Sequence, residues 1–387
     1  MEHAGAGALV VVLTATCIAS TACGAEHPQS KSFKPGASEF QSQPVQLPQG
    51  RRAAVWDASR GRLWILTAED TTRRMSLTSY DPATQRSTTS VISDDDSNFV
   101  NGALTVDASH VWAAWGRELV QFDPDDASVK SFGLPQALTG DAPTEVHVGD
   151  SRAVLNMVEA NGRLWMNVDG VSAIAMFDSS TSTWSSETPS DSATTPMSSL
   201  AATGQSVWVD RKTAAGLTLQ AVPAPASPSA PASVSDAAVR QLPVIAFAAR
   251  DAQHLAIVTA QSQIEDFDVT TGALRPSSVV VEGIMPSVSM AGGSTGDLWA
   301  WRRTGSGDAL VHIDANMTSA TDVDFHDVTV ELNRNPTTGG GTGAAAHLVD
   351  PAVQTITPTP YGVFVTTRYG SDGQERSPYA GMYVVKG

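Results

Sequence analysis

The stretch Gly61-Arg62-Leu63-Trp64-Ile65 contains the pattern that decides the fold: turn or polar residues followed by apolar, tryptophan, apolar. The pattern returns with its tryptophan at Trp112, Trp165, Trp208 and Trp299. Degenerate copies without tryptophan stand at 253–257 and 361–365. Successive copies are about 43 to 65 residues apart. A chain with a repeat of this length is built from stacked units that bury their apolar faces against each other.

A second element follows most copies: an aromatic or aliphatic residue, then aspartate, then a turn. The instances are Tyr80-Asp81-Pro82, Phe122-Asp123-Pro124, Phe177-Asp178-Ser179, Phe267-Asp268-Val269 and Ile313-Asp314-Ala315. An aspartate in this place favours a tight turn, because its carboxylate accepts backbone N–H groups further along. Between the two elements, stretches such as 118–122 alternate with the period of two that strands require. Each unit therefore predicts four strands, which in the second unit lie at 103–106, 111–115, 119–122 and 129–132.

Seven such units can be counted, and they begin near Arg52, Gly102, Ala153, Met197, Val244, Pro286 and Ile356. The sequence predicts an all-β fold, a seven-bladed β-propeller with four-stranded antiparallel blades over residues 44–387. The last unit is one strand short, and an early strand at 44–48 is expected to pair with it and close the ring. Closure removes exposed sheet edges. The tryptophans are expected to pack between neighbouring blades, where each buries a large apolar area.

Phe267-Asp268-Val269-Thr270-Thr271-Gly272 resembles the turn of quinoprotein-like repeats. Through this and the shorter motifs, residues 44–387 resemble the broad secreted group of propellers with quinoprotein-like and streptogramin-lyase-like repeats. The resemblance implies a secreted propeller. It implies no cofactor, and none is predicted.

The first residues predict an export signal. An apolar run at 8–19 is too short to span a bilayer but has the length of a signal-peptide core, so 1–22 is predicted to be a signal peptide. Ser20-Thr21-Ala22-Cys23-Gly24 resembles a bacterial lipobox, which implies lipidation of Cys23 and a lipid anchor at the extracytoplasmic face of the cell membrane. Ser20 in place of the usual leucine and the lack of Lys or Arg before the apolar run depart from that pattern. Plain secretion and an uncleaved anchor are the alternatives.

Three further segments have the composition of tethers or loops, and the composition of the whole chain argues against some classes of partner. Residues 23–43 are predicted to be a flexible tether, 223–235 a Pro/Ala-rich insertion and 333–346 a Gly/Thr-rich loop. A net charge of −16 argues against nucleic acid and against anionic lipid surfaces, so membrane attachment is expected through the lipid alone. Both cysteines, Cys17 and Cys23, lie in the export segment, which leaves the body without a disulfide or thiolate metal site. A monomer is expected.

Charged residues in predicted loops suggest a recognition face. Loops between second and third strands are predicted to carry arginines, and loops joining blades to carry aspartates, at one face of the ring. The candidate residues are Arg74, Arg117, Arg211, Arg302, Asp94 and Asp96. The alternative is that these are solvated turn charges, which contribute little. The run 94–98 also resembles a calcium loop, but Phe99 and Thr105 stand where that pattern needs Gly and Glu.

The sequence contains no zinc spacing of histidines, no nucleophile elbow and no phosphate-binding loop. No catalytic or metal-binding residue is predicted. The leading hypothesis is a binding or scaffolding propeller of the cell envelope with a protein partner. A solute- or glycan-binding sensor module is the alternative, followed by a propeller lyase or hydrolase.

Overall fold

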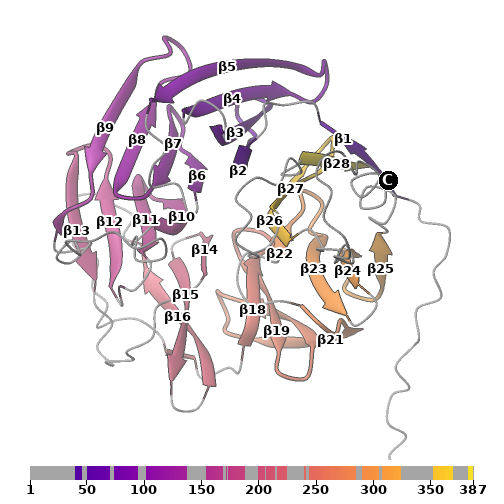
Figure 1. Cartoon of the computed structure of the whole chain (residues 1–387). Helices are drawn as coiled ribbons and strands as arrows, with labels where there is room; N and C mark the ends of the chain where they lie inside the picture. Colours follow the sequence, from indigo (N-terminus) through magenta and orange to yellow (C-terminus); the bar gives the residue numbers. More distant parts are fainter. Residues whose placement is uncertain are drawn as a thin grey trace, which may run out of the picture. The chain divides into compact units, whose positions relative to one another are not determined.

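The computed structural model describes residues 40–45, 50–69, 74–94, 102–136, 154–168, 171, 173–187, 199–204, 206–213, 216–224, 239–240, 244–284, 290–304, 307–323, 352–368 and 382–386. These residues form seven four-stranded sheets (Figure 1), and paired strands run antiparallel throughout. In the described part of the chain, no helix has the length and apolar character needed to cross a membrane.

Each of the first six blades is a run of four consecutive strands, as predicted. Blade 1 contains β2 (Gly50–Asp57), β3 (Arg62–Glu69), β4 (Met75–Asp81) and β5 (Arg86–Ser93); blade 2 contains β6 (Gly102–Val106), β7 (Val111–Trp115), β8 (Glu118–Phe122) and β9 (Val129–Gly133). Blade 3 contains β10 (Val154–Ala160), β11 (Arg163–Val168), β12 (Ile174–Asp178) and β13 (Thr183–Glu187); blade 4 contains β14 (Leu200–Thr203), β15 (Ser206–Thr213), β16 (Gly216–Pro223) and β17 (Val239–Arg240). Blade 5 contains β18 (Val244–Ala249), β19 (His254–Thr259), β20 (Gln263–Asp268) and β21 (Leu274–Val280); blade 6 contains β22 (Met290–Gly292), β23 (Leu298–Thr304), β24 (Gly307–Ile313) and β25 (Ala320–Val323).

The seventh blade joins the two ends of the folded chain. Its strands β26 (Ala352–Thr359), β27 (Gly362–Arg368) and β28 (Met382–Lys386) are completed by β1 (Gln41–Pro44), which pairs with β28. The predicted closing strand therefore exists, but it starts at Gln41 rather than Pro44. The end of the predicted tether belongs to the ring, because Phe40 packs against blade 6 and the next residues pair with β28. The signal peptide, Cys23 and the rest of the tether lie outside the described residues.

The blades are held together by apolar clusters at their interfaces. Seven clusters of buried residues form, and each contains side chains from two neighbouring blades, with one between blades 7 and 1. The motif tryptophans Trp64, Trp112, Trp165, Trp208 and Trp299 all pack in such clusters. The innermost strands contact one another around the ring, and β26 contacts β2. The predicted packing of tryptophan between blades is confirmed.

The two predicted insertions fall almost entirely outside the described residues. Pro223 is the last residue of β16, and Ala224 is buried, so the start of the insertion predicted at 223–235 belongs to blade 4. Residues 225–235 and the Gly/Thr-rich loop at 333–346 lie outside the described part of the chain.

Candidate functional site

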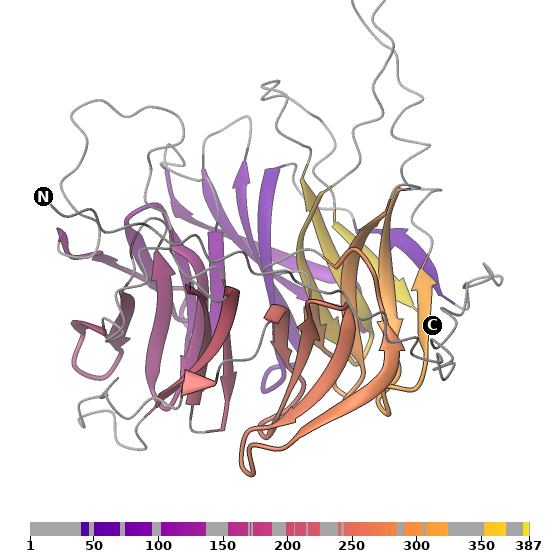
Figure 2. The same cartoon turned by 90° about the horizontal axis from the view of Figure 1, so that it is seen from below.

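Seen from the side, the strands of each blade run between two faces of the ring (Figure 2). We call the face with the turns between first and second strands the hairpin face. Its turns are β2–β3, β6–β7, β10–β11, β14–β15, β18–β19, β22–β23 and β26–β27. We call the face with the turns between second and third strands the loop face, because the connections between blades also emerge there.

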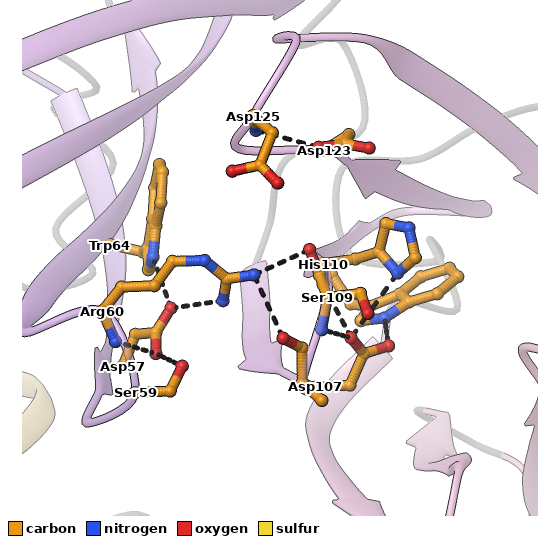
Figure 3. A network of polar contacts seen from close by, with 11 residues as sticks. Asp57, Ser59, Arg60, Trp64, Asp107, Ser109, His110, Asp123 and Asp125 are labelled. Atoms are coloured by element: carbon orange, nitrogen blue, oxygen red, sulfur yellow. Dashed lines mark hydrogen bonds and ion pairs between the residues drawn. The ribbon is translucent and has the colours of Figure 1, made fainter.

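Asp57 at the end of β2 organises the first turn of the hairpin face (Figure 3). Its carboxylate is 1% exposed and accepts hydrogen bonds from Ser59 Oγ (2.6 Å), Arg60 N (3.1 Å), Arg60 Nη1 (2.8 Å) and Trp64 Nε1 (3.2 Å). Burial by itself would raise the pKa of Asp57, but the donors from Ser59, Arg60 and Trp64 outweigh it and lower that pKa. The ionised carboxylate holds the turn and orients the buried tryptophan.

Arginines then connect one turn to the next blade. Arg60 Nη2 donates to the carbonyls of Ala108 (3.2 Å) and Ser109 (2.8 Å) in the β6–β7 turn (Figure 3). Arg250 in the β18–β19 turn does the same for blades 5 and 6. It pairs with Asp266 through Nη1 (2.8 Å) and donates from Nη2 to the carbonyls of Gly296 (2.8 Å) and Ala315 (2.7 Å). These two side chains clamp neighbouring blades together.

In other repeats, too, a side-chain oxygen accepts the indole N–H of the tryptophan. Asp107 Oδ2 accepts Trp112 Nε1 at 2.6 Å, and Thr203 Oγ1 accepts Trp208 Nε1 at 2.8 Å. Asp297 accepts Trp299 Nε1 at 2.8 Å and lies 3.2 Å from His312 Nε2. The hydrogen bond with His312 is the largest cause that lowers the pKa of Asp297, against the effect of burial.

The grouping of Asp107, Ser109 and His110 contains the residue types of a hydrolytic triad, but its geometry is that of a turn. Asp107 Oδ1 accepts the backbone N–H groups of Ser109 (2.7 Å) and His110 (2.6 Å), and His110 Nδ1 lies 3.5 Å away. Blade 5 repeats this with Asp251, which accepts His254 N (2.9 Å) and contacts His254 Nδ1 (2.9 Å). The two histidines are features of the repeat, and their aspartates hold turns.

A cavity of about 450 Å³ opens on the hairpin face between the turns of blades 3, 4 and 5. Its lining residues are mostly small, with two carboxylates among them: Glu159, Ala160, Asn161, Ala202, Gly204, Ala249, Arg250, Asp251 and Ala252. A Cβ added at Gly204 would lie 3.0 Å from the carbonyl oxygen of Ala252, so the turns of blades 4 and 5 approach closely here. The small residues leave space that longer side chains would fill.

Glu159 is the half-buried acid of this cavity. Burial raises its pKa, the hydrogen bond from Gly162 N to Oε1 (2.8 Å) opposes that shift, and the charge of Asp107 adds to it. Trp165 in the same repeat is fully buried, and its Nε1 has no hydrogen-bond partner among the described residues. The sequence did contain a signal for this site: Glu159-Ala160 precedes its turn as Asp-Ala precedes the turns of blades 1, 2 and 5. By strand register, however, Glu159 stands opposite Leu164, the place that Trp56 and Val106 hold in blades 1 and 2.

The predicted recognition residues are distributed over the loop face and the sheets. Arg74 Nε lies 3.1 Å from Asp94 Oδ1, and both side chains are exposed (52% and 83%), so the β3–β4 loop and the end of β5 do meet at one face. Arg117 is exposed in the β7–β8 turn. Asp96 lies outside the described residues.

Arg211 and Arg302 were predicted to lie in loops, and this placement is wrong. Arg211 is within β15 opposite Thr218, and Arg302 is within β23 opposite Ala309, because both hairpins continue their backbone pairing past the polar residues. Arg302 is largely buried and forms an ion pair with Asp322 of β25. Of the run 94–98 considered for calcium, residues 95–98 lie outside the described residues. Among the described residues, no group of three acidic, histidine or cysteine side chains could hold a metal ion.

No protein-family model matches the chain, and no curated protein matches it. Solved structures do match. U3-55K aligns with a TM-score of 0.54 at 9% identity, over 91% of this chain and 99% of that one, and the WD40 repeats of RRP9 align with a TM-score of 0.54 at 9% identity, over 90% and 99%. The extracellular domain of the one component system BT4673 from B. thetaiotaomicron aligns with a TM-score of 0.51 at 15% identity, over 89% of this chain and 40% of that longer one. The chain is a seven-bladed β-propeller. At these identities the likeness concerns the fold alone.

Proposed function

We propose that this protein is a binding or scaffolding propeller of the cell envelope, held at the membrane by a lipid on Cys23, that engages a protein partner with its loop face. The observation that carries the proposal is the exposed pair of Arg74 and Asp94, which brings opposite charges from two loops together at 3.1 Å on that face. Arg117, also exposed, occupies the corresponding turn of the next blade. Charged groups on loops of a rigid scaffold suit the recognition of a complementary surface.

The use of the polar groups on the hairpin face supports binding over catalysis. Asp57 and Asp107 accept several hydrogen bonds within their own turns, and His110 contacts the carboxylate of Asp107. A general base needs a lone pair directed at a substrate proton, and these aspartates direct theirs at turn donors. The seven apolar interfaces keep the ring rigid, which suits a scaffold.

The anchor is tested by fractionating cells that express wild type, Cys23→Ala or Cys17→Ala, with intact-mass analysis of the mature chain. We expect wild type and Cys17→Ala in the membrane fraction, with a lipid mass on Cys23, and release of Cys23→Ala. A wild-type protein that is soluble and cleaved elsewhere would overturn the anchored location.

The binding face is tested with a photo-crosslinker at position 74 in intact envelopes, which identifies the partner, and by affinity measurement with the purified pair. Reversing Arg74 and Arg117 to Glu should weaken binding about tenfold or more, since each reversal turns an attraction into a repulsion. The control is Arg86→Glu, an exposed reversal at the start of β5 on the other face. Equal affinity of the reversed and wild-type proteins would refute the proposed face.

A further inference from the structure

We propose that the cavity between the turns of blades 3, 4 and 5 binds a small organic cation, an ammonium or guanidinium solute, with Glu159 and Asp251 as its counter-charges. This site lies on the hairpin face, so it is separate from the protein-binding surface proposed on the loop face and does not depend on the lipid anchor.

Glu159 retains hydrogen-bond acceptor capacity that the turn aspartates Asp57 and Asp107 have used. In blades 1 and 2 the aspartate at the end of the innermost strand accepts the tryptophan N–H. Among the described residues, one hydrogen bond reaches Glu159, from Gly162 N to Oε1, and Trp165 Nε1 has no partner. Glu159 stands opposite Leu164, one residue before the strand position of Asp57 and Asp107, and its carboxylate lines the cavity with acceptor sites left for a ligand.

The lining of the cavity carries negative charge. Asp251 brings a second carboxylate, 51% exposed, from the β18–β19 turn. The guanidinium of Arg250 does not neutralise them, because it is paired with Asp266 and donates to the carbonyls of Gly296 and Ala315 in the direction of blade 6. His254 contacts Asp251 through Nδ1. Arg250 lines the cavity, but its guanidinium is engaged elsewhere, so the two carboxylates favour a cation in the cavity.

The size of the cavity fits a small organic molecule. A volume of about 450 Å³ lies within the range of roughly 300–1,000 Å³ of small-molecule sites. It exceeds the space of a bare metal ion, and two carboxylates are too few for calcium, which takes about six to eight oxygen ligands. Ala202, Gly204 and Ala252 form small walls against which the methylene groups of a short diamine or of agmatine can pack. The close approach of Gly204 to Ala252 keeps these walls in place.

The experiment uses the purified chain without its signal peptide, titrated with agmatine and with putrescine. Binding is followed by calorimetry and by the indole N–H resonances of the ¹⁵N-labelled protein, in which Trp165→Phe assigns the Trp165 signal. We expect saturable binding and a shift of the Trp165 indole signal, because Trp165 packs in the cluster that contains Ala160 and contacts Ala202. Glu159→Gln and Asp251→Asn should each weaken binding about tenfold, since each removes one charge-assisted hydrogen bond.

Two controls distinguish a specific cation-binding site from a cavity that binds solutes non-specifically. Glu118→Gln, at an exposed carboxylate where β8 starts on the loop face, should leave agmatine binding unchanged. Uncharged 1,4-butanediol, which has the same carbon chain as putrescine, should not bind. Ala252→Phe should abolish binding while the protein stays folded, because Ala252 is exposed and its larger replacement fills the cavity.

Four results would overturn the proposal, and three of them concern the organic solutes. The first is equal binding of butanediol and putrescine, and the second is agmatine binding that Glu159→Gln and Asp251→Asn leave unchanged. The third is the absence of a saturable signal up to about 10 mM agmatine, a concentration well above the dissociation constant of a weak specific site. Binding of Ca²⁺ that depends on Glu159, without agmatine binding, would also refute it.

Discussion

Replacing one tryptophan by phenylalanine should have very different consequences in blades 2 and 3. Trp112 and Trp165 occupy the same place in their repeats, and both are 0% exposed between neighbouring blades. The Trp112 indole N–H donates to Asp107 at 2.6 Å, whereas that of Trp165 has no partner among the described residues. We expect Trp112→Phe to destabilise the protein clearly more than Trp165→Phe.

The size of the difference follows from the two indole groups. A hydrogen bond to a charged acceptor contributes about 1.5–3 kcal/mol, and an unsatisfied buried donor costs about 1–3 kcal/mol. Trp112→Phe loses the first contribution, and Trp165→Phe removes the second penalty. The loss of ring volume is the same in both and cancels. Asp107 is partly exposed, so water can replace part of the lost bond, and we expect a gap of about 2.5 kcal/mol, at the lower end of the combined range of about 2.5–6 kcal/mol.

The measurement is urea unfolding of both variants and wild type, followed by far-UV circular dichroism and by fluorescence of the remaining tryptophans. Coincident transitions by the two probes justify two-state analysis, and the free energies of unfolding are compared by linear extrapolation. Equal losses in the two variants, or a larger loss in Trp165→Phe, would refute the reasoning that the aspartate hydrogen bond stabilises the turn and that Trp165 lacks one.

Three further outcomes are expected. Glu159→Gln should raise the free energy of unfolding at pH 7, because the raised pKa of Glu159 means that its ionisation disfavours the folded state. This increase in stability should vanish below the ordinary pKa of 4.5, where Glu159 is protonated in both the folded and the unfolded state. Urea unfolding at the two pH values measures the difference. Phe40→Ala should destabilise ring closure by about 1–2 kcal/mol through its lost ring contacts with Trp299 and His312, seen as faster amide exchange in β1 and β28. Gly292→Ala should lower the melting temperature by several degrees, because the added Cβ would lie 2.3 Å from the Ala249 carbonyl oxygen. The control Gly133→Ala should leave the melting temperature nearly unchanged, because no atom of the described residues beyond its chain neighbours lies within 4 Å of its added Cβ.

The strand that closes the ring shows which features of the fold a local sequence pattern can predict. The need for a strand to complete the last blade could be predicted, because that blade lacked one and an open ring would leave sheet edges unpaired. Its position could not be predicted, since Gln41–Pro44 has no apolar alternation that a sequence pattern would detect. The pairing of Gln41 with Lys386 and the packing of Phe40 against Trp299 set the position.

The candidate sites show the same limit. The loop-face residues Arg74 and Asp94 were predicted together and lie 3.1 Å apart. Arg302 has the same polar signature, but it lies within a strand and pairs with Asp322 two strands away, a contact that only the hairpin register creates. The cavity between blades 3, 4 and 5 was not predicted, because its walls come from three turns about 45 residues apart in the sequence.

The sequence by itself determined the number of blades, the order of their strands and the place of the tryptophans between them. Strand periodicity and turn chemistry are local properties, and a repeated unit that cannot bury its apolar face alone must stack on its neighbours. The tertiary structure decided which polar groups remain open to a ligand. Asp57 and Glu159 both lie at the turn ends of innermost strands, but Asp57 is fully occupied by its own turn and its tryptophan, and Glu159 lines a cavity. That difference depends on the strand register, on the indole within reach and on the neighbouring blades, which are set only when the ring folds.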